Sequence, residues 1–86
     1  MTRAQLIAQI QAKKSVLCVG LDPDMDKMPA HFPRTAEGLA NFCCAIIDAT
    51  APYAVAYKPN LAFFEALGVA GWQALARVAD HLRRYP

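Results

Sequence analysis

The sequence lacks a long apolar run and an excess of charge of one sign. No apolar stretch approaches the roughly 20 residues of a membrane-spanning helix. Residues 1–14 mix Arg3 with glutamines and lysines and do not resemble a signal peptide. Nine basic and seven acidic residues leave a formal net charge of +2, and no basic stripe interleaved with aromatics indicates a nucleic-acid surface. We therefore expect a cytoplasmic protein that binds neither membranes nor nucleic acids.

The sequence also lacks cysteines at metal-binding spacing. Its three cysteines form no C-x-x-C pair and have no histidine partner at zinc spacing. Cys18 falls in an apolar strand, and Cys43 and Cys44 fall in an amphipathic helix. The sequence therefore predicts buried, reduced thiols without a disulfide and no metal site. The two basic pairs, at residues 13–14 and 83–84, end predicted helices, where cations favour the helix dipole and remain solvated.

With 86 residues, 56% of them hydrophobic, the chain is apolar for its size. Such a short domain buries only a modest share of its surface. We therefore expect its apolar faces to pack against elements beyond these residues. No internal repeat or domain boundary is apparent, so residues 1–86 are expected to form part of a single domain.

Hydrophobic periodicity predicts four helices and two strands. The first helix, capped by Thr2, is expected to reach about Lys14. The expected strands are residues 15–22 and 54–58, both almost continuously apolar, as in a buried parallel sheet. The remaining expected helices are residues 35–51, ended by Pro52; 61–67, with Gly68 as the C-cap; and 70–84, with Trp72 on the apolar face.

Strands separated by helices predict an α/β protein with a parallel sheet and right-handed crossovers. Both an open doubly wound sheet and a (β/α)8 barrel begin in this way. The first strand is not followed by G-x-G-x-x-G or a P-loop, which weakens a dinucleotide-binding interpretation.

Two charged residues end the strand faces that carry small side chains. Alternation places Asp22 on a face with Cys18 and Gly20, and Lys58 on a face with Ala54 and Ala56. Sites in parallel α/β folds form at the carboxyl ends of strands, and neighbouring strands lie about 4.8 Å apart. Asp22 and Lys58 are therefore expected to face one side, within reach of each other or of one ligand. The alternatives are a structural salt bridge and two solvated strand ends.

Other polar residues are weaker candidates. Residues 23–34 form a loop with three prolines, long enough to hint at a function. Asp24, Asp26 and Lys27 on this loop are expected to be solvated, and His31 has no visible partner. The remaining candidates lie on helices: Asp48 and Glu65 away from the strand ends, His81 on the surface and Trp72 in the core.

Residues 16–24 (VLCVGLDPD) and 51–68 (APYAVAYKPNLAFFEALG), with IIDAT at 46–50, resemble orotidine 5'-phosphate decarboxylases of the bacterial subgroup with YKPN at strand two. The resemblance covers most of residues 15–72 and implies the N-terminal part of a (β/α)8 barrel. It also implies a homodimer that needs no metal or organic cofactor and converts orotidine 5'-monophosphate to UMP and CO2.

In this family, an Asp after strand one holds the ribose hydroxyls and a Lys after strand two joins an alternating charge network. By resemblance, Asp22 is the first and Lys58 the second. The family's Asp-x-Lys-x-x-Asp motif after strand three, whose Lys protonates the C6 carbanion, does not occur in these residues. The resemblance therefore implies that these 86 residues alone are inactive.

Two other functions remain open at this point. Sister enzymes with the same barrel act on sugar phosphates, as synthases or decarboxylases, although YKPN followed by LAFFEALG favours the orotidine branch. A non-catalytic chain that binds a partner through its apolar faces is the alternative from another class.

Overall fold

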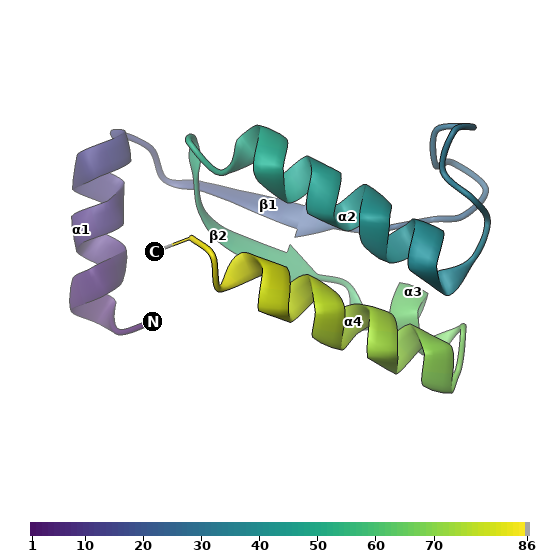
Figure 1. Ribbon diagram of the computed structural model, residues 1–86. Helices are drawn as coiled ribbons and strands as arrows, with labels where there is room; N and C mark the ends of the chain where they lie inside the picture. Colours follow the sequence, from purple (N-terminus) through teal and green to yellow (C-terminus); the bar gives the residue numbers. More distant parts are fainter. Residues whose placement is uncertain (86) are drawn as a thin grey trace.

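The computed structural model describes residues 1–85 and has an α/β fold (Figure 1). Two strands alternate with helices, as the sequence predicts. The elements are α1 (Arg3–Lys13), β1 (Leu17–Leu21), α2 (Ala36–Thr50), β2 (Ala54–Pro59), α3 (Leu61–Glu65) and α4 (Val69–Leu82). The first strand is shorter than the predicted span of residues 15–22, and the other elements lie within a few residues of their predicted ends.

The two strands are parallel neighbours. Leu17 pairs with Ala54 and Leu21 with Pro59, with an irregularity between Leu17 and Cys18. Helices α2 and α4 lie side by side along one face of this sheet (Figure 1). The opposite face is uncovered within residues 1–85, so Cys18 and Gly20 are exposed. This arrangement, two strands backed by the helices that follow them, is that of part of a (β/α)8 barrel.

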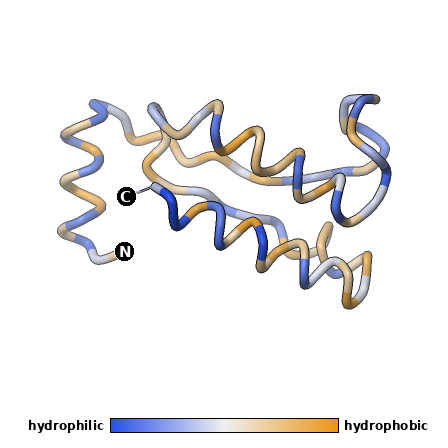
Figure 2. Tube along the Cα trace, viewed as in Figure 1, coloured by the Kyte–Doolittle hydropathy of each residue, from blue (hydrophilic) through white to orange (hydrophobic). Residues whose placement is uncertain are grey.

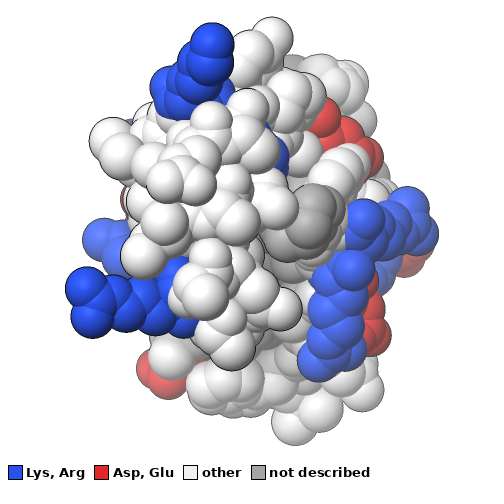
Figure 3. All heavy atoms as spheres, turned by 90° about the vertical axis from the view of Figure 1, so that its left-hand side faces the viewer, with Lys and Arg blue, Asp and Glu red and all other residues white. Residues whose placement is uncertain are grey.

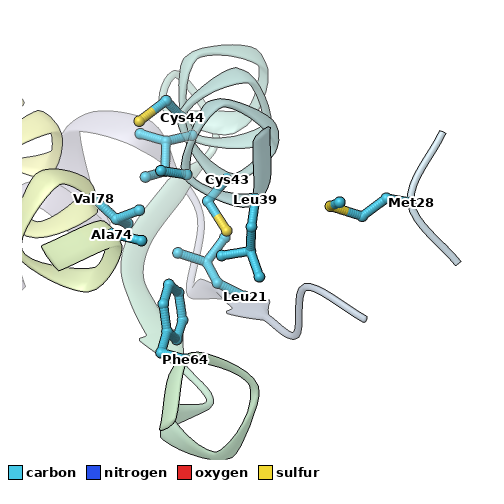
Figure 4. Close-up of a cluster of buried hydrophobic side chains, with 10 residues drawn as sticks. Leu21, Met28, Leu39, Cys43, Cys44, Phe64, Ala74 and Val78 are labelled. Carbon is cyan, nitrogen blue, oxygen red and sulfur yellow. The ribbon is translucent and has the colours of Figure 1, made fainter. Parts of the chain in front are cut away.

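A hydrophobic core fills the space between the sheet and its two helices. Leu39, Cys43 and Ile47 recur every fourth residue along α2, and all three are buried, as the 3.6-residue period predicts. They meet Leu21 from β1 and Phe64 from α3 (Figure 4). In Figure 2 the apolar segments of α2 and α4 correspondingly recur once per turn. Val19 and Leu21 of β1 therefore meet the helices, whereas Cys18 and Gly20 are exposed.

Helix α1 lies across the end of the sheet where the strands begin (Figure 1). Thr2 caps it in a capping box with Gln5. The expectation of a solvated basic pair at its end is wrong for Lys13. Its Nζ donates hydrogen bonds of 2.8 Å to the carbonyls of Ala51 and Ala54, because the lysine reaches the connection between α2 and β2. Lys13 thus ties α1 to β2.

The structure corrects two predictions about α4. Trp72 is 47% exposed, because the helix packs through Gly71, Ala74 and Val78 instead. A Cβ at Gly71 would lie 1.7 Å from the Phe64 carbonyl oxygen, so the two backbones touch and this contact sets the rotation of α4. Gly68 is the N-cap of α4, at φ 65°, and Ala66 is the C-cap of α3.

The end of the molecule that carries α1 is broadly uncharged, with basic side chains at its rim and acidic ones among them (Figure 3). This dispersed pattern differs from the continuous basic stripe of a nucleic-acid surface. Among residues 1–85, no helix combines the length and the hydropathy needed to span a membrane.

Candidate active site at the carboxyl ends of the strands

Asp22 lies directly after β1, at the edge of the sheet where both strands end. The Leu21 carbonyl before it accepts a 2.9 Å hydrogen bond from the Asn60 amide, and Pro23 after it is buried. Asp22 itself is exposed. The backbone around this carboxylate is therefore fixed on both sides while its side chain faces solvent.

Lys58 occupies the matching place on the second strand. It is the register partner of Gly20, and paired residues of neighbouring strands point to the same face. A Cβ at Gly20 would lie 3.3 Å from Asp22 Oδ2, so the Asp22 carboxylate lies over that same face. Asp22 and Lys58 thus share the uncovered side of the sheet, and both are exposed.

No salt bridge joins Asp22 to Lys58 or to any other residue in the described part of the chain. The alternative of a structural salt bridge is therefore not what the structure shows. That the two side chains engage one ligand remains a prediction. On this face of the sheet, the Asp22 carboxylate suits hydroxyl groups of a ligand, and the Lys58 ammonium suits a negative charge on the same ligand.

Asn60 supports the candidate site from below, which the sequence alone does not indicate. Its amide joins the end of β2 to Leu21 of β1. Its side chain accepts a 3.2 Å hydrogen bond from the Ala62 amide and caps α3. An Asn before a helix is a recognisable capping signal, but its bond to the other strand has no local sequence signature. Asn60 therefore holds the two strand ends together beneath the two charges.

The other loop candidates do not join the site. Asp26 and Lys27 are exposed as expected, whereas Asp24 is half-buried and its Oδ1 accepts a 3.0 Å hydrogen bond from the Asp26 amide. His31 is exposed and its ring lies against Phe32, with 4.3 Å between the ring centroids. Asp24 therefore shapes the loop, and His31 has no polar partner within residues 1–85.

Asp48, His81 and Tyr85 form a separate polar cluster between α2 and the end of α4. Asp48 Oδ1 lies 2.7 Å from His81 Nε2 and accepts a 2.5 Å hydrogen bond from Tyr85 Oη. These two hydrogen bonds hold the pKa of Asp48 below its ordinary value, and the bond from Tyr85 has the larger effect. The same hydrogen bond to Asp48 raises the pKa of Tyr85. The expectation that His81 lies free on the surface is wrong, because its side chain is only 12% exposed.

The three cysteines are free and lie in different environments. Burial, and then the neighbouring thiol of Cys44, raises the pKa of Cys43 to about 12. Cys18 is exposed, contrary to expectation, because nothing within residues 1–85 covers its face of β1. No group of three or more His, Cys, Asp or Glu side chains in this part of the chain is arranged to hold a metal ion.

A cavity of about 580 Å³ lies between α1, β2 and the end of α4. Its polar and apolar lining includes Gln5, Lys13, Val55 and Tyr57, but neither Asp22 nor Lys58. It adjoins α1, at the edge of the sheet where the strands begin. Because catalytic residues of parallel α/β folds gather at the opposite edge, we place the candidate site at Asp22 and Lys58.

Comparison with known proteins finds relatives over the whole of this chain. The sequence is 51% identical over its whole length to the orotidine 5'-phosphate decarboxylase of Phocaeicola vulgatus and 52% identical over 98% of its length to that of Leptospira interrogans. It spans 32% and 31% of those proteins, so the chain is about a third as long as the curated relatives it matches. No family model matches the sequence.

Two solved structures share the fold over nearly the whole chain. A crystal structure assigned to orotidine-monophosphate-decarboxylase of Toxoplasma gondii superposes with a TM-score of 0.83 and 49% identity, covering 91% of this chain and 26% of that one. Leishmania donovani UMP synthase superposes with a TM-score of 0.72 and 43% identity, covering 95% of this chain and 16% of that one. These TM-scores show that the similarity extends from the sequence to the three-dimensional fold.

Proposed function

The chain belongs to the orotidine 5'-phosphate decarboxylase family, and we propose that it supplies two charged residues, Asp22 and Lys58, to an orotidine 5'-phosphate decarboxylase site. The similarity of the whole of this chain to about a third of known decarboxylases carries this proposal. The position of both residues on the uncovered face of the sheet supports it, because they end β1 and β2 side by side. The reaction converts orotidine 5'-monophosphate to UMP and CO2.

In this reaction the bond between C6 of the pyrimidine and its carboxylate breaks and CO2 leaves. The electron pair stays on C6, which then takes up a proton. Asp22 accepts hydrogen bonds from the ribose hydroxyls. Lys58 presents its ammonium to the charge network around the substrate, where a preorganised charge stabilises the transition state. The proton donor, a lysine of the family's Asp-x-Lys-x-x-Asp motif, is not among these 86 residues.

The proposal includes the setting of this site. Residues 1–86 form the N-terminal portion of a single (β/α)8 domain, and the active protein is a cytoplasmic homodimer that needs no metal or organic cofactor. The sister function, on sugar phosphates, has less support, because the relatives and solved structures described above carry orotidine decarboxylase or UMP synthase names.

A hybrid enzyme tests the proposal. In it, residues 1–86 replace the matching segment of the Phocaeicola vulgatus decarboxylase, with which they align end to end. We expect the purified hybrid to produce UMP from orotidine 5'-monophosphate, to retain this activity in excess chelator, and to bind 6-azaUMP saturably in a fluorescence titration. A folded hybrid without UMP production and without nucleotide binding would instead favour a non-catalytic interaction surface.

A further inference from the structure

Arg34 makes three of the hydrogen bonds that order the loop between β1 and α2, residues 23–34. The three prolines of this loop lack an amide hydrogen and so remove three backbone donors. Several loop carbonyls therefore need donors from elsewhere. Arg34 supplies them: its Nη2 donates to the Met28 carbonyl at 2.7 Å, and its Nη1 donates to the carbonyls of Pro29 and Phe32, each at 3.2 Å.

Arg34 forms no salt bridge within residues 1–85. A guanidinium carries five donors in a fixed planar fork. In Arg34, two of its nitrogens donate hydrogen bonds to three carbonyls of the loop 23–34. A surface arginine without such a role commonly extends into water. The guanidinium of Arg34 therefore stabilises the conformation of the loop.

Three hydrogen bonds in series connect Arg34 to Asp22. The guanidinium holds the Met28 carbonyl, the Met28 amide donates to the Asp24 carbonyl at 3.0 Å, and the Asp24 amide donates to the Asp22 carbonyl at 2.9 Å. The Met28 side chain is 4% exposed and anchors this path in the core. The conformation of the loop is therefore coupled to the backbone of the candidate site.

The far end of the loop is fixed against α2. Phe32 meets Phe42 edge to face, with 5.5 Å between the ring centroids. A Cβ at Gly38 would lie 2.0 Å from the Pro33 carbonyl oxygen, so the loop backbone lies directly on the helix. Both ends of the loop are therefore fixed, and Arg34 bonds three carbonyls in the segment between them.

We propose that Arg34 is a positioning residue of the decarboxylase site: it holds loop 23–34 closed and thereby fixes Asp22 where the ribose hydroxyls bind. This inference rests on the proposed function. Because Asp22 binds ribose in both the ground state and the transition state, its misplacement weakens substrate binding more than it slows the chemical step.

The test compares three variants of the hybrid enzyme. Arg34→Ala removes all three hydrogen bonds, Arg34→Lys retains a charge that cannot span the three carbonyls, and Arg3→Ala removes an exposed arginine that makes no side-chain hydrogen bond within residues 1–85. For Arg34→Ala we expect KM for orotidine 5'-monophosphate to rise about tenfold or more, with a smaller change in kcat. Arg34→Lys should be intermediate, and Arg3→Ala should match the parent hybrid.

Hydrogen exchange provides a readout that does not depend on turnover. The Lys27 and Met28 amides, both bonded to the Asp24 carbonyl, should exchange about tenfold faster or more in Arg34→Ala, and remain unchanged in Arg3→Ala. If Arg34→Ala does not fold, KM and the exchange of the Lys27 and Met28 amides are measured on Arg34→Lys instead, and these values test the inference. Unchanged exchange, or a KM within twofold of the parent in an active hybrid, overturns the inference. If the parent hybrid is inactive but the Lys27 and Met28 amides exchange faster in Arg34→Ala, the proposed function is overturned. The role of Arg34 in ordering the loop would still be established.

Discussion

Lys58 of β2 lies directly beside Gly20 of β1 in the parallel pair of strands. Because glycine has no side chain, the space over this pair is left to the Lys58 side chain and the Asp22 carboxylate, which lies above Gly20. Both charges therefore occupy the face that α2 and α4 do not cover.

Lys58→Ala in the hybrid enzyme should cost much activity and little stability. Lys58 is exposed and makes no side-chain hydrogen bond within residues 1–85, so truncation removes few contacts. Removal of a preorganised charge commonly costs about 2.7–4 kcal/mol in the barrier, or about 10²–10³ in rate. Steady-state kinetics and thermal melting of the same samples measure both effects.

Lys14→Ala is the matched control for Lys58→Ala, because it removes an exposed amine next to α1, at the opposite edge of the sheet. We expect near-normal turnover from this control. If Lys58→Ala instead kept near-normal turnover and lost many degrees of melting temperature, Lys58 would be a structural residue.

Gly38→Ala should destabilise the fold, although alanine favours a helix over glycine by about 1 kcal/mol at an ordinary position. The added Cβ would lie 2.0 Å from the Pro33 carbonyl oxygen and 2.8 Å from its carbon, and neither backbone atom can move without shifting the loop. Overpacking of this kind costs about 1–3 kcal/mol or more. Urea unfolding of the hybrid measures the sign, and a more stable Gly38→Ala variant contradicts the packing described here.

Tyr85→Phe should raise the titration midpoint of Asp48. The hydrogen bond from Tyr85 is the largest cause of the lowered pKa of Asp48, ahead of that from His81. Because the folded pKa lies below the ordinary value of 3.8, the charged carboxylate contributes stability above that pH, and this contribution is lost as the pH falls through the folded pKa. Carbon-13 NMR of the Asp48 carboxyl in the hybrid measures the midpoint.

His81→Ala is the second variant for Asp48, and it should also raise the midpoint, because it removes both a hydrogen bond to the carboxylate and a nearby positive charge. An Asp48 midpoint at its ordinary value of 3.8 in the unsubstituted hybrid would show that the cluster does not form in solution.

All three cysteines should be free, and Cys43 should be the least reactive. With its pKa raised to about 12 by burial and then by Cys44, Cys43 remains a thiol at pH 8, and the thiolate is the reactive form. Alkylation of the native hybrid, read by peptide mass spectrometry, should modify Cys43 more slowly than after denaturation. A disulfide-linked peptide in fresh, unreduced protein would contradict the free-thiol assignment.

The order of elements and the placement of Asp22 and Lys58 follow from local sequence rules. The four-residue spacing of Leu39, Cys43 and Ile47 indicates which side of α2 is buried, and alternation along β1 separates Leu21 from Gly20. These rules succeed because each depends on neighbours along one element. The sequence therefore predicts both the parallel strands and the face that carries the charges.

Contacts between distant segments were not predictable in this way. Trp72 fits an apolar stripe on α4, but the close approach of Gly71 to the Phe64 carbonyl rotates the helix and leaves Trp72 outside. The bonds of Arg34 to loop carbonyls likewise depend on the path of the backbone, which has no periodic signature. The sequence therefore shows which residues are apolar or charged, and the folded backbone decides which of them meet.

A polypeptide of residues 1–86 alone should neither decarboxylate nor fold as a stable monomer. Both outer edges of its two-stranded sheet present unpaired backbone groups. Val16 and Leu17, both apolar, are 78% and 46% exposed within residues 1–85. The accessible surface is 5543 Å², against roughly 5000 Å² expected for a compact monomer of this mass.

The cost of ordering the chain and the absence of the proton-donating lysine lead to the same expectation for this polypeptide. Ordering costs about 1.5 kcal/mol per residue, and we expect burial on one side of two strands not to offset that cost. Chemically, Asp22 and Lys58 can at best hold a substrate, because the family's proton-donating lysine is not among these residues. Sedimentation, thermal melting and a UMP assay of residues 1–86, with the hybrid enzyme as the folded and active control, measure both properties. A cooperative transition in a monomer, or UMP above background, would show that two βα units are more self-sufficient than their exposed edges and open face imply.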